Sequence, residues 1–377
     1  MRQVSRNHSR KAYFIKMDIR GFFFNINKVI LYQTLAKRIR NQDLLWLTRT
    51  IIFHDCTENV VVKGKSTLLK NVPPHKTLFN TQNKRGLPIG NLTSQFFANV
   101  YLNALDQFVK HHLKARYYIR YCDDFVLLHE EKERLLQWRE QIKEFLKARL
   151  RLDLNDGRQA MGPIRTGIDF LGYIVRSDYL LVRRRVVNRC KEKLVAYRKR
   201  LMRQKKDCIA IEYDHEQLKK LMATWASYMA HLKMANTYGL KRKLLDRFSW
   251  LGYLFHQREE KLKMLDEVPA RLHRLKGQYR FFLGKCRGSI LFFQVGRFYE
   301  LYDKQAEIAQ EALGLNRMAV TRGFQIRCGF PVRFKQRYLR RLLRSGFPVH
   351  IVEEVGWFHH LKKRRLTEHW LPLFLRS

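Results

Sequence analysis

The chain has few of the residues that build disulfide or zinc frameworks, with six cysteines among 377 residues. They stand at positions 56, 122, 190, 208, 286 and 328. No two of them form a CxxC pair, and no set of histidine ligands accompanies them. This spacing argues against a zinc site and against a disulfide-stapled fold, and it predicts reduced thiols in a cytoplasmic protein.

Long hydrophobic runs are also missing. No stretch reaches the roughly 20 apolar residues of a membrane span, and the polar, basic first 11 residues do not resemble a signal peptide. We therefore expect no membrane partner and a cytoplasmic location.

Acidic residues are scarce, since 33 Asp and Glu stand against 75 Lys and Arg, a formal net charge of +42. Such a charge exceeds what solubility requires and predicts a polyanionic partner, most simply nucleic acid. The 25 Phe and 17 Tyr add faces on which bases can stack. A hydrophobic fraction of 46% excludes a disordered or fibrous chain.

Period-2 patterns in the first half place acidic residues at strand ends. Residues 12–19 read as a buried strand, and Asp18 lies at its C-terminal end. Residues 117–121 and 125–129 are apolar runs on either side of Cys122-Asp123-Asp124, the layout of a β-hairpin with carboxylates at its tip. Helical patterns cover 28–53, 92–115 and 130–150, and residues 170–175 read as a strand.

The second half begins with a basic helical pattern over 187–255, which shows no strand signal. Strand-like residues 289–294 and a helical pattern over 298–313 then indicate that a new domain has begun. We expect an α+β protein with domains at 1–178, 179–265 and 266–377.

Carboxylates that converge from two strands suit nucleotide addition with two divalent cations. Asp-Asp in a turn is weak evidence by itself, because turns favour aspartate for their geometry alone. The surrounding sequence adds the specific signal. In order along the chain it contains KMDIRGFF at 16–23, GLPIGNLTSQ at 86–95, YCDD at 121–124 and FLGY at 170–173.

These four blocks resemble the reverse transcriptase family. The resemblance implies a polymerase palm, a small antiparallel sheet with helices, followed by a helical, basic thumb. It implies that Asp18, Asp123 and Asp124 are the catalytic carboxylates. They would hold two Mg²⁺ ions, or Mn²⁺ instead, together with the main-chain carbonyl of Ile19.

The resemblance also implies a nucleotide pocket and a grip on the primer. Phe23 would select deoxynucleotides, and Arg158, in place of the usual lysine, would stabilise the leaving group electrostatically. The remaining positions are Ile89, Gly90, Ser94 and Gln95 for the nucleotide and Leu171, Gly172 and Tyr173 for the primer grip.

The block at 86–95, with Ile89, is similar to that of reverse transcriptases of diversity-generating retroelements, whose DNA synthesis is error-prone opposite template adenines. An apolar side chain cannot hydrogen-bond the incoming nucleotide, and a lost polar contact lowers selectivity. Structured template RNA, a cDNA or DNA primer and deoxynucleotides are the expected partners, with a basic accessory protein as a further candidate.

Only 17 residues precede Asp18, whereas the family has a fingers region there. A separate fingers polypeptide, a late assigned start and a decayed gene all remain open. The alternatives to a retroelement polymerase are a noncatalytic nucleic-acid-binding remnant and a group II intron or retron reverse transcriptase.

A second resemblance covers most of 285–356, through ILFFQVGRFYELY at 290–302, GFP at 329–331 and GFPVHIVEEVG at 346–356. These residues resemble the first domain of the MutS mismatch-repair protein, a small α/β domain. By that resemblance Phe298 would wedge into a duplex at a mispair and Glu300 would hydrogen-bond the displaced base. The alternative is that Phe298 and Glu300 belong to the start of an ordinary packed helix.

Overall fold

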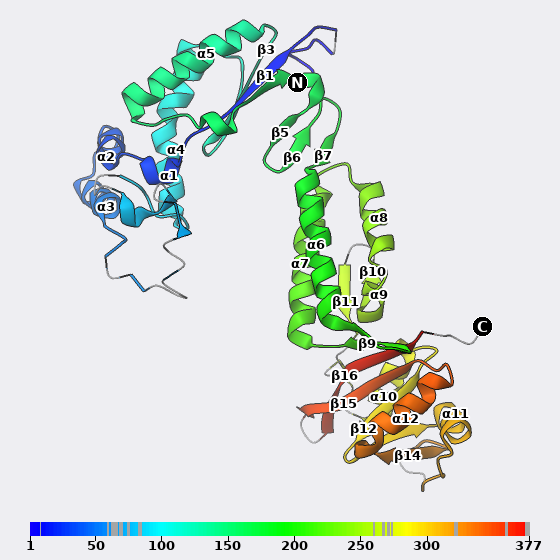
Figure 1. Ribbon diagram of the computed structural model, residues 1–377. Helices are drawn as coiled ribbons and strands as arrows, with labels where there is room; N and C mark the ends of the chain where they lie inside the picture. The colour runs from blue at the N-terminus through cyan, green and yellow to red at the C-terminus, as the bar shows by residue number, and fades with distance from the viewer. Residues whose placement is uncertain are drawn as a thin grey trace. The chain divides into compact units, whose positions relative to one another are not determined.

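A computed structural model describes the chain except for residues 8, 59, 62–66, 68–70, 74–75, 82–84, 259–260, 266–267, 270–271, 273, 320–322, 359–360 and 374–377. The chain divides into an N-terminal unit, Met1–Leu180, and a C-terminal unit, Leu181–Ser377 (Figure 1). Both contain helices and strands, so the predicted α+β class is confirmed. Within the described residues no helix is long and apolar enough to cross a membrane. The predicted boundary at residue 266 lies outside the described residues.

The N-terminal unit is built on a four-stranded antiparallel sheet in the order β2-β3-β1-β4. The strands are β1 (Tyr13–Asp18), β2 (Tyr117–Tyr121), β3 (Asp124–His129) and β4 (Ala160–Pro163). The predicted hairpin is therefore confirmed, and the register pairs Asp18 with Asp124 across β1 and β3. Met17, Phe125 and Leu127 are fully buried on the face that the helices cover.

Helices on this sheet follow the predicted apolar patterns with one interruption. They are α1 (Phe22–Asn25), α2 (Lys28–Ala36), α3 (Gln42–Phe53), α4 (Leu92–Gln107) and α5 (Lys132–Phe145). A single π-helical turn extends α4 over Phe108–His112 and another extends α5 over Leu146–Leu150. The predicted helix over 28–53 is in fact two, because the Asn41 side chain accepts a hydrogen bond from the Leu44 amide and starts α3 as an N-cap.

Residues 170–175 do not form one strand as predicted, because a turn at Leu171 and Gly172 divides them between two strands. Strands β5 (Ile168–Phe170), β6 (Tyr173–Val175) and β7 (Leu180–Val182) make a three-stranded sheet. Leu171 and Gly172 connect β5 to β6 with φ angles of 50° and 93°. Two consecutive positive φ angles are typical of a type I′ turn, whose twist matches that of the flanking strands.

The C-terminal unit contains a seven-stranded sheet in the order β14-β13-β12-β15-β16-β9-β8. Its strands are β8 (Met202–Gln204), β9 (Cys208–Glu212), β12 (Ile290–Val295), β13 (Phe298–Tyr302), β14 (Arg327–Pro331), β15 (Val349–Phe358) and β16 (Leu361–Pro372). Helices α11 (Lys304–Leu313) and α12 (Lys335–Arg344) pack with one face of it around Phe292, Tyr299 and Ile351.

The other face of this sheet packs against a mostly helical layer around Trp225, Phe282 and Phe293. That layer consists of α6 (Arg184–Leu201), α7 (His215–Lys233), α8 (Tyr238–Arg247), α9 (Leu251–Leu254), α10 (Leu275–Lys285) and the hairpin β10 (Phe255–Arg258) and β11 (Lys261–Met264). The expectation of helices without strands over 187–255 was therefore wrong, because β8 and β9 interrupt it.

The helix predicted over 298–313 was also wrong in its first part. Phe298 begins β13, which pairs with β12 and β14, and the helix starts only at Lys304. Register pairing with distant residues such as Pro331 overrides the local helical pattern here.

Candidate active site

Three aspartates lie where β1 ends and the β2–β3 hairpin turns. Asp18 is the last residue of β1, Asp124 is the first residue of β3, and Asp123 occupies the turn between β2 and β3. Cys122 enters that turn with a φ of 52°, a left-handed conformation that L residues rarely adopt. The tight turn brings Asp123 to the same sheet end as Asp18.

Like charges are crowded at this end of the sheet. Burial raises the pKa of Asp123 above its usual value of 3.8, and the negative charges of Asp18 and Asp124 raise it further. A hydrogen bond from its own backbone and the positive charge of Arg158 oppose that rise without cancelling it. Asp18 is itself only 5% exposed.

Asp18 and Asp124 have different polar partners. The Asn155 side chain donates to Oδ2 of Asp18 at 2.9 Å, and a guanidinium nitrogen of Arg158 lies 3.6 Å from the same oxygen. Asp124 instead pairs with Lys16, whose Nζ lies 3.4 Å from Oδ1. The cation beside Asp18 is therefore largely open to solvent, since the Arg158 side chain is 69% exposed.

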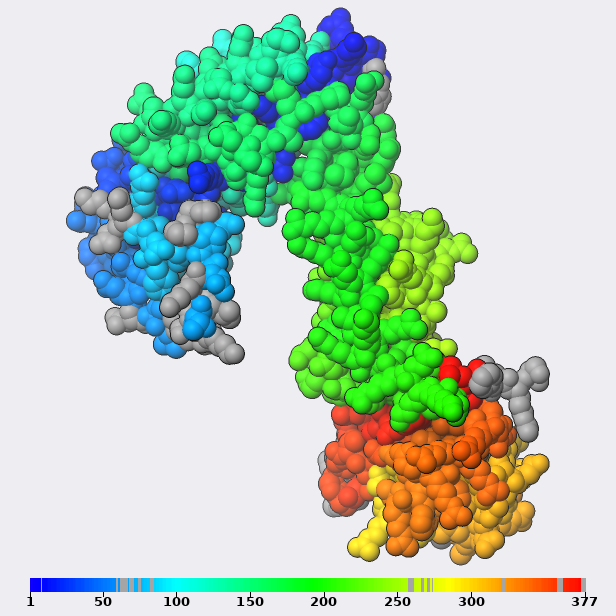
Figure 2. Space-filling model, in the orientation of Figure 1, coloured from blue at the N-terminus to red at the C-terminus, as the bar shows by residue number. Residues whose placement is uncertain are grey.

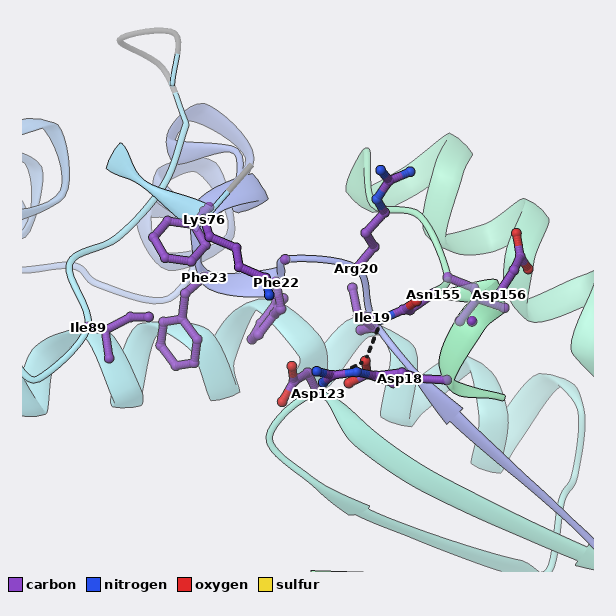
Figure 3. A pocket seen from close by; sticks show the side chains of 15 residues that line it. Asp18, Ile19, Arg20, Phe22, Phe23, Lys76, Ile89, Asp123, Asn155 and Asp156 are labelled. Atoms are coloured by element: carbon purple, nitrogen blue, oxygen red, sulfur yellow. Dashed lines mark hydrogen bonds and ion pairs between the residues drawn. The ribbon is translucent and has the colours of Figure 1, made fainter. Parts of the chain in front are cut away.

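Asp18 and Asp123 line the same pocket, a cavity of about 740 Å³. Figure 3 shows their carboxylates beside each other, with Phe23 and Ile89 on one side and Asn155 on the other. Ile89, which lines the apolar side of the pocket, is itself 66% exposed. Asp124 is not among the residues that line this pocket.

The structure gathers some of the predicted nucleotide-pocket residues and not others. Phe23, Ile89 and Arg158 line the cavity together with Ile19. Gly90 has a φ of 113°, which only glycine adopts readily, but Gly90, Ser94 and Gln95 do not line it. Ser94 is 3% exposed in the first turn of α4, and Gln95 is exposed beside it.

Four polar lining residues were missed from the sequence: Arg20, Lys76, Asn155 and Asp156. Arg20 lies two residues beyond Asp18, and its position just past a strand end was a usable signal. Asn155 is 137 residues from Asp18, and only the alternating pattern at Leu152 and Leu154 hinted at a segment that pairs with β1. Lys76 stands in an irregular segment that has no periodic signal.

The donor set suits a hard divalent cation. Among the described residues no cluster of three or more His, Cys, Asp or Glu side chains is assembled around one point. Asp18 and Asp123 nevertheless supply carboxylate oxygens, the ligand type that Mg²⁺ prefers. A bound cation would also relieve the repulsion that raises the pKa of Asp123.

The turn Leu171-Gly172 and Tyr173 belong to the β5–β6 hairpin and do not line the pocket. Leu171 is 41% exposed at the turn. An exposed turn with a glycine is compatible with close approach of another backbone.

A second candidate site lies in the C-terminal unit, at the β12–β13 hairpin. Phe298 is 37% exposed where β13 leaves the turn at Gly296 and Arg297, whereas Glu300 is 4% exposed two residues later. Arg327 donates from Nη2 to Oε1 of Glu300 at 2.5 Å and from Nε to Oε2 at 3.0 Å, and the Tyr302 hydroxyl also donates to this carboxylate. Glu300, which the resemblance predicts to hydrogen-bond a displaced base, thus forms its hydrogen bonds with Arg327 and Tyr302.

Comparison with known families matches both halves of the chain. Residues 1–175 match the family described as reverse transcriptase (RNA-dependent DNA polymerase), and residues 273–370 match MutS domain I. The DNA mismatch repair protein MutS of Bradyrhizobium sp. (strain ORS 278) is 37% identical over 92 residues, which is 24% of this chain and 10% of that protein.

The MutS protein of Rhodopseudomonas palustris (strain BisB5) is 38% identical over 91 residues, 23% of this chain and 10% of its own length. The chain thus spans about a tenth of these curated relatives. Among solved structures, telomerase from Candida tropicalis aligns with a TM-score of 0.34 and 11% identity, over 66% of this chain and 43% of that one.

Proposed function

Since residues 1–175 form a reverse transcriptase domain and residues 273–370 a MutS domain I, we propose that this protein is an RNA-directed DNA polymerase. It extends a DNA primer on a structured RNA template by adding deoxynucleotides. The observation that carries the proposal is the shared pocket of Asp18 and Asp123, in which burial, together with neighbouring negative charges, raises the pKa of Asp123.

Asp18 and Asp123 hold the catalytic cations in this proposal, with the Ile19 carbonyl and Asp124 beside them. Two Mg²⁺ ions, when bound, supply a lowered pKa for the primer 3′-hydroxyl and neutralise charge on the triphosphate. Asn155 fixes the carboxylate of Asp18 through its 2.9 Å hydrogen bond, so that one oxygen stays oriented. Lys16 lies close to Asp124 and offsets its negative charge.

Arg20, Lys76 and Arg158 are the cations of the pocket lining and bind the triphosphate and the departing pyrophosphate. Phe23 lies against the sugar and selects deoxynucleotides. Ile89 packs against the nucleotide without a hydrogen bond. Gly90, Ser94 and Gln95 act indirectly by shaping the turn before α4 and the first turn of that helix.

The primer 3′ end rests on the Leu171-Gly172 turn and Tyr173 in this proposal. A separate polypeptide contributes the fingers, and a basic accessory protein assists with the template RNA. The reaction takes place in the cytoplasm.

Primer extension tests the polymerase. The full chain is given an RNA template, a DNA primer, deoxynucleotides and Mg²⁺, with and without polypeptides encoded upstream of it. We expect cDNA that disappears in EDTA and in the variant Asp18→Asn, whereas Asp153→Asn, an exposed carboxylate outside the pocket lining, keeps the activity. Equal activity of the two variants, or no product with any upstream partner, would leave the noncatalytic binding protein as the better account.

The retroelement subtype predicts errors opposite template adenines. Sequencing the cDNA of Ile89→Gln should show fewer of these errors, because glutamine restores a polar contact that discriminates between nucleotides. Leu92→Gln is the matched control, since Leu92 is 84% exposed nearby but does not line the pocket. An unchanged error spectrum in Ile89→Gln would favour an intron or retron type of enzyme.

The MutS-like module binds imperfect duplex in this proposal, with Phe298 as an exposed apolar wedge. Glu300 supports the hairpin from inside through Arg327 and meets a base only if that ion pair opens. Phe298→Ala should lower the preference for mismatched over matched duplex, measured as the ratio of dissociation constants. An unchanged ratio would remove the wedge.

A further inference from the structure

Helix α12 has an arginine-rich outer face that neither the wedge nor the polymerase pocket uses. Arg333, in the short 3₁₀ turn Val332–Phe334 that precedes the helix, is followed at intervals of four, three and four residues by Arg337, Arg340 and Arg344. With 3.6 residues per turn these four side chains lie along one narrow face, about 16 Å long. We call them the arginine stripe.

All four members of the stripe are exposed, and none of the ion pairs found among the described residues includes them. The other cations of the helix have internal partners. Lys335 pairs with Glu353 at 3.1 Å and Glu368 at 2.8 Å, and Arg341 donates to the Leu313 carbonyl at 3.1 Å. The helix therefore separates cations that hold the fold from cations that face solvent.

Folding alone explains little of this composition, because only Arg344 of the stripe lies in the last turn, where a cation favours the helix dipole. Like charges three or four residues apart repel along a helix, and cations in its first turn oppose the helix dipole. The first turn of α12 has no acidic residue to compensate. An external anion that reaches the stripe would remove this repulsion.

The stripe begins beside the exposed phenylalanine of the β12–β13 hairpin. The Val332 amide donates to the Arg297 carbonyl at 3.0 Å, and Pro331 pairs in register with Phe298. Phe334 is 37% exposed at the same place, with the Arg333 guanidinium 4.9 Å from its ring centre. In Figure 1, α12 (orange) runs across the face of this sheet, and Figure 2 shows orange residues at the surface there.

We propose, on the basis of the duplex binding proposed for the MutS-like module, that the arginine stripe binds the phosphodiester backbone of a nucleic-acid duplex and positions that duplex for Phe298. Duplex DNA carries one phosphate about every 3.4 Å along each strand, so about 16 Å of helix face can reach several phosphates. Guanidinium groups bind phosphate through paired hydrogen bonds. Contacts of this kind set position and affinity and do not depend on base sequence.

The test measures duplex binding by the full chain as a function of salt. Arg337→Gln Arg340→Gln is compared with Arg287→Gln Lys304→Gln, which removes the same charge from exposed positions near the strand ends opposite the β12–β13 turn. The first double variant should bind roughly 10- to 30-fold more weakly at 0.15 M salt, and its log–log salt slope should fall by about 1.8. The second should change affinity less than about twofold. Circular dichroism and thermal unfolding check that both remain folded.

Matched DNA duplex, RNA·DNA hybrid and RNA duplex are the three arms, and the arm with the largest loss identifies the duplex. Equal behaviour of the two double variants in every arm would overturn the proposal. The wedge is judged separately: the arginine variant should keep the ratio of mismatched to matched affinity, whereas Phe298→Ala should change that ratio and keep the salt slope. A changed mismatch ratio in the arginine variant, with an unchanged slope, also speaks against phosphate contacts.

Discussion

Carboxylates at the pocket of the N-terminal unit and in the sheet of the C-terminal unit have opposite surroundings. In the N-terminal unit Asp123 has other carboxylates as its neighbours, and burial together with their charge raises its pKa. In the C-terminal unit Glu300 is bonded to Arg327, and Glu354 lies 2.7 Å from Arg364. Although burial alone would raise the pKa of Glu353, hydrogen bonding to Tyr299 and the charge of Lys335 lower it.

This difference separates sites from scaffolds. Buried charge is costly unless it is paired, so carboxylates of the scaffold come with their own cations. Carboxylates that lack full compensation retain capacity for an external cation. This criterion supports the proposed metal site at Asp18 and Asp123, whereas Glu300 is part of the structure of its hairpin, although the sequence motif suggested contact with a base.

The sharpest test of the comparison is Asp123→Asn, with an expected loss of about 10³-fold or more in extension rate. The folded state should become more stable at neutral pH. A folded pKa above 3.8 means that the folded protein holds the proton more tightly than the unfolded chain, so stability falls as pH rises through that window. Asparagine does not titrate and avoids this fall. Extension rates and hydrogen exchange within residues 1–180 measure the two effects.

Glu300→Gln is the matched change in the other unit and should have the reverse profile. The rate of primer extension should stay the same. Hydrogen exchange in β13 and β14 should accelerate, because Arg327 loses its charged partner. If Asp123→Asn lowered stability as much as Glu300→Gln, the distinction between site and scaffold would fail.

Arg327→Met should destabilise the C-terminal unit by about 3–5 kcal/mol, because it leaves the Glu300 carboxylate buried without its cation. Adding Glu300→Met in the same chain should recover much of this loss, since two apolar side chains need no pairing. Urea unfolding followed by tryptophan fluorescence measures both variants. Failure of the second change to rescue the first would show that Arg327 acts through other contacts.

A pair of histidines extends the comparison to pH. His350 and His369 face each other across β15 and β16 with ring centres 3.6 Å apart. Burial lowers the pKa of His369 from 6.5 to about 4, and burial with the neighbouring imidazole lowers that of His350 to about 2. The unfolded chain therefore binds protons that the folded one does not.

Stability of the C-terminal unit should be complete above pH 6.5 and fall as pH decreases toward 4, by about 1.4 kcal/mol per pH unit for each histidine. Unfolding free energies between pH 7 and pH 4.5 measure the slope. His369→Phe should flatten it by about half within that range. A slope that is the same in wild type and variant would mean that other groups control acid unfolding.

The smallest expected effect is that of Lys16→Met, which removes the cation 3.4 Å from Asp124. Because the pair is partly exposed, we expect a change of up to about 1 kcal/mol, or up to about fivefold in extension rate. Loss of this positive charge should also move the acidic limb of the pH–rate profile to higher pH. Lys11→Met, an exposed lysine just before β1, is the control and should leave the profile unchanged.

Sequence periodicity predicted the elements that carry the aspartates, because β1, β2 and β3 are apolar runs with clear limits. The resemblance to reverse transcriptases, and not the periodicity, predicted that Asp18 and Asp123 would lie together. Periodicity missed β8 and β9. Strand β9 pairs with β16, more than 150 residues further along the chain, and β8 pairs with β9. No local pattern in Cys208–Glu212 reports a partner so far away.

The same limit explains the errors at the two sites. Asn155 reaches Asp18 only because Leu154 pairs with Ile19 across the end of β1. Glu300 and Arg327 are brought together by the β13–β14 register, which turns a motif residue into half of an internal ion pair. Compensation of a buried charge is a property of tertiary contacts and cannot be read from a motif.

Strand β9 has a further consequence for how this protein can be divided. It pairs with β16 from Cys208 to Glu212, so residues before and after 266 contribute to one sheet. A truncation at that point would expose the backbone edge of an apolar strand, Cys-Ile-Ala-Ile, which invites intermolecular pairing and aggregation. In evolution and in engineering alike, this chain could then lose or exchange residues 266–377 only with a second change that covers this edge.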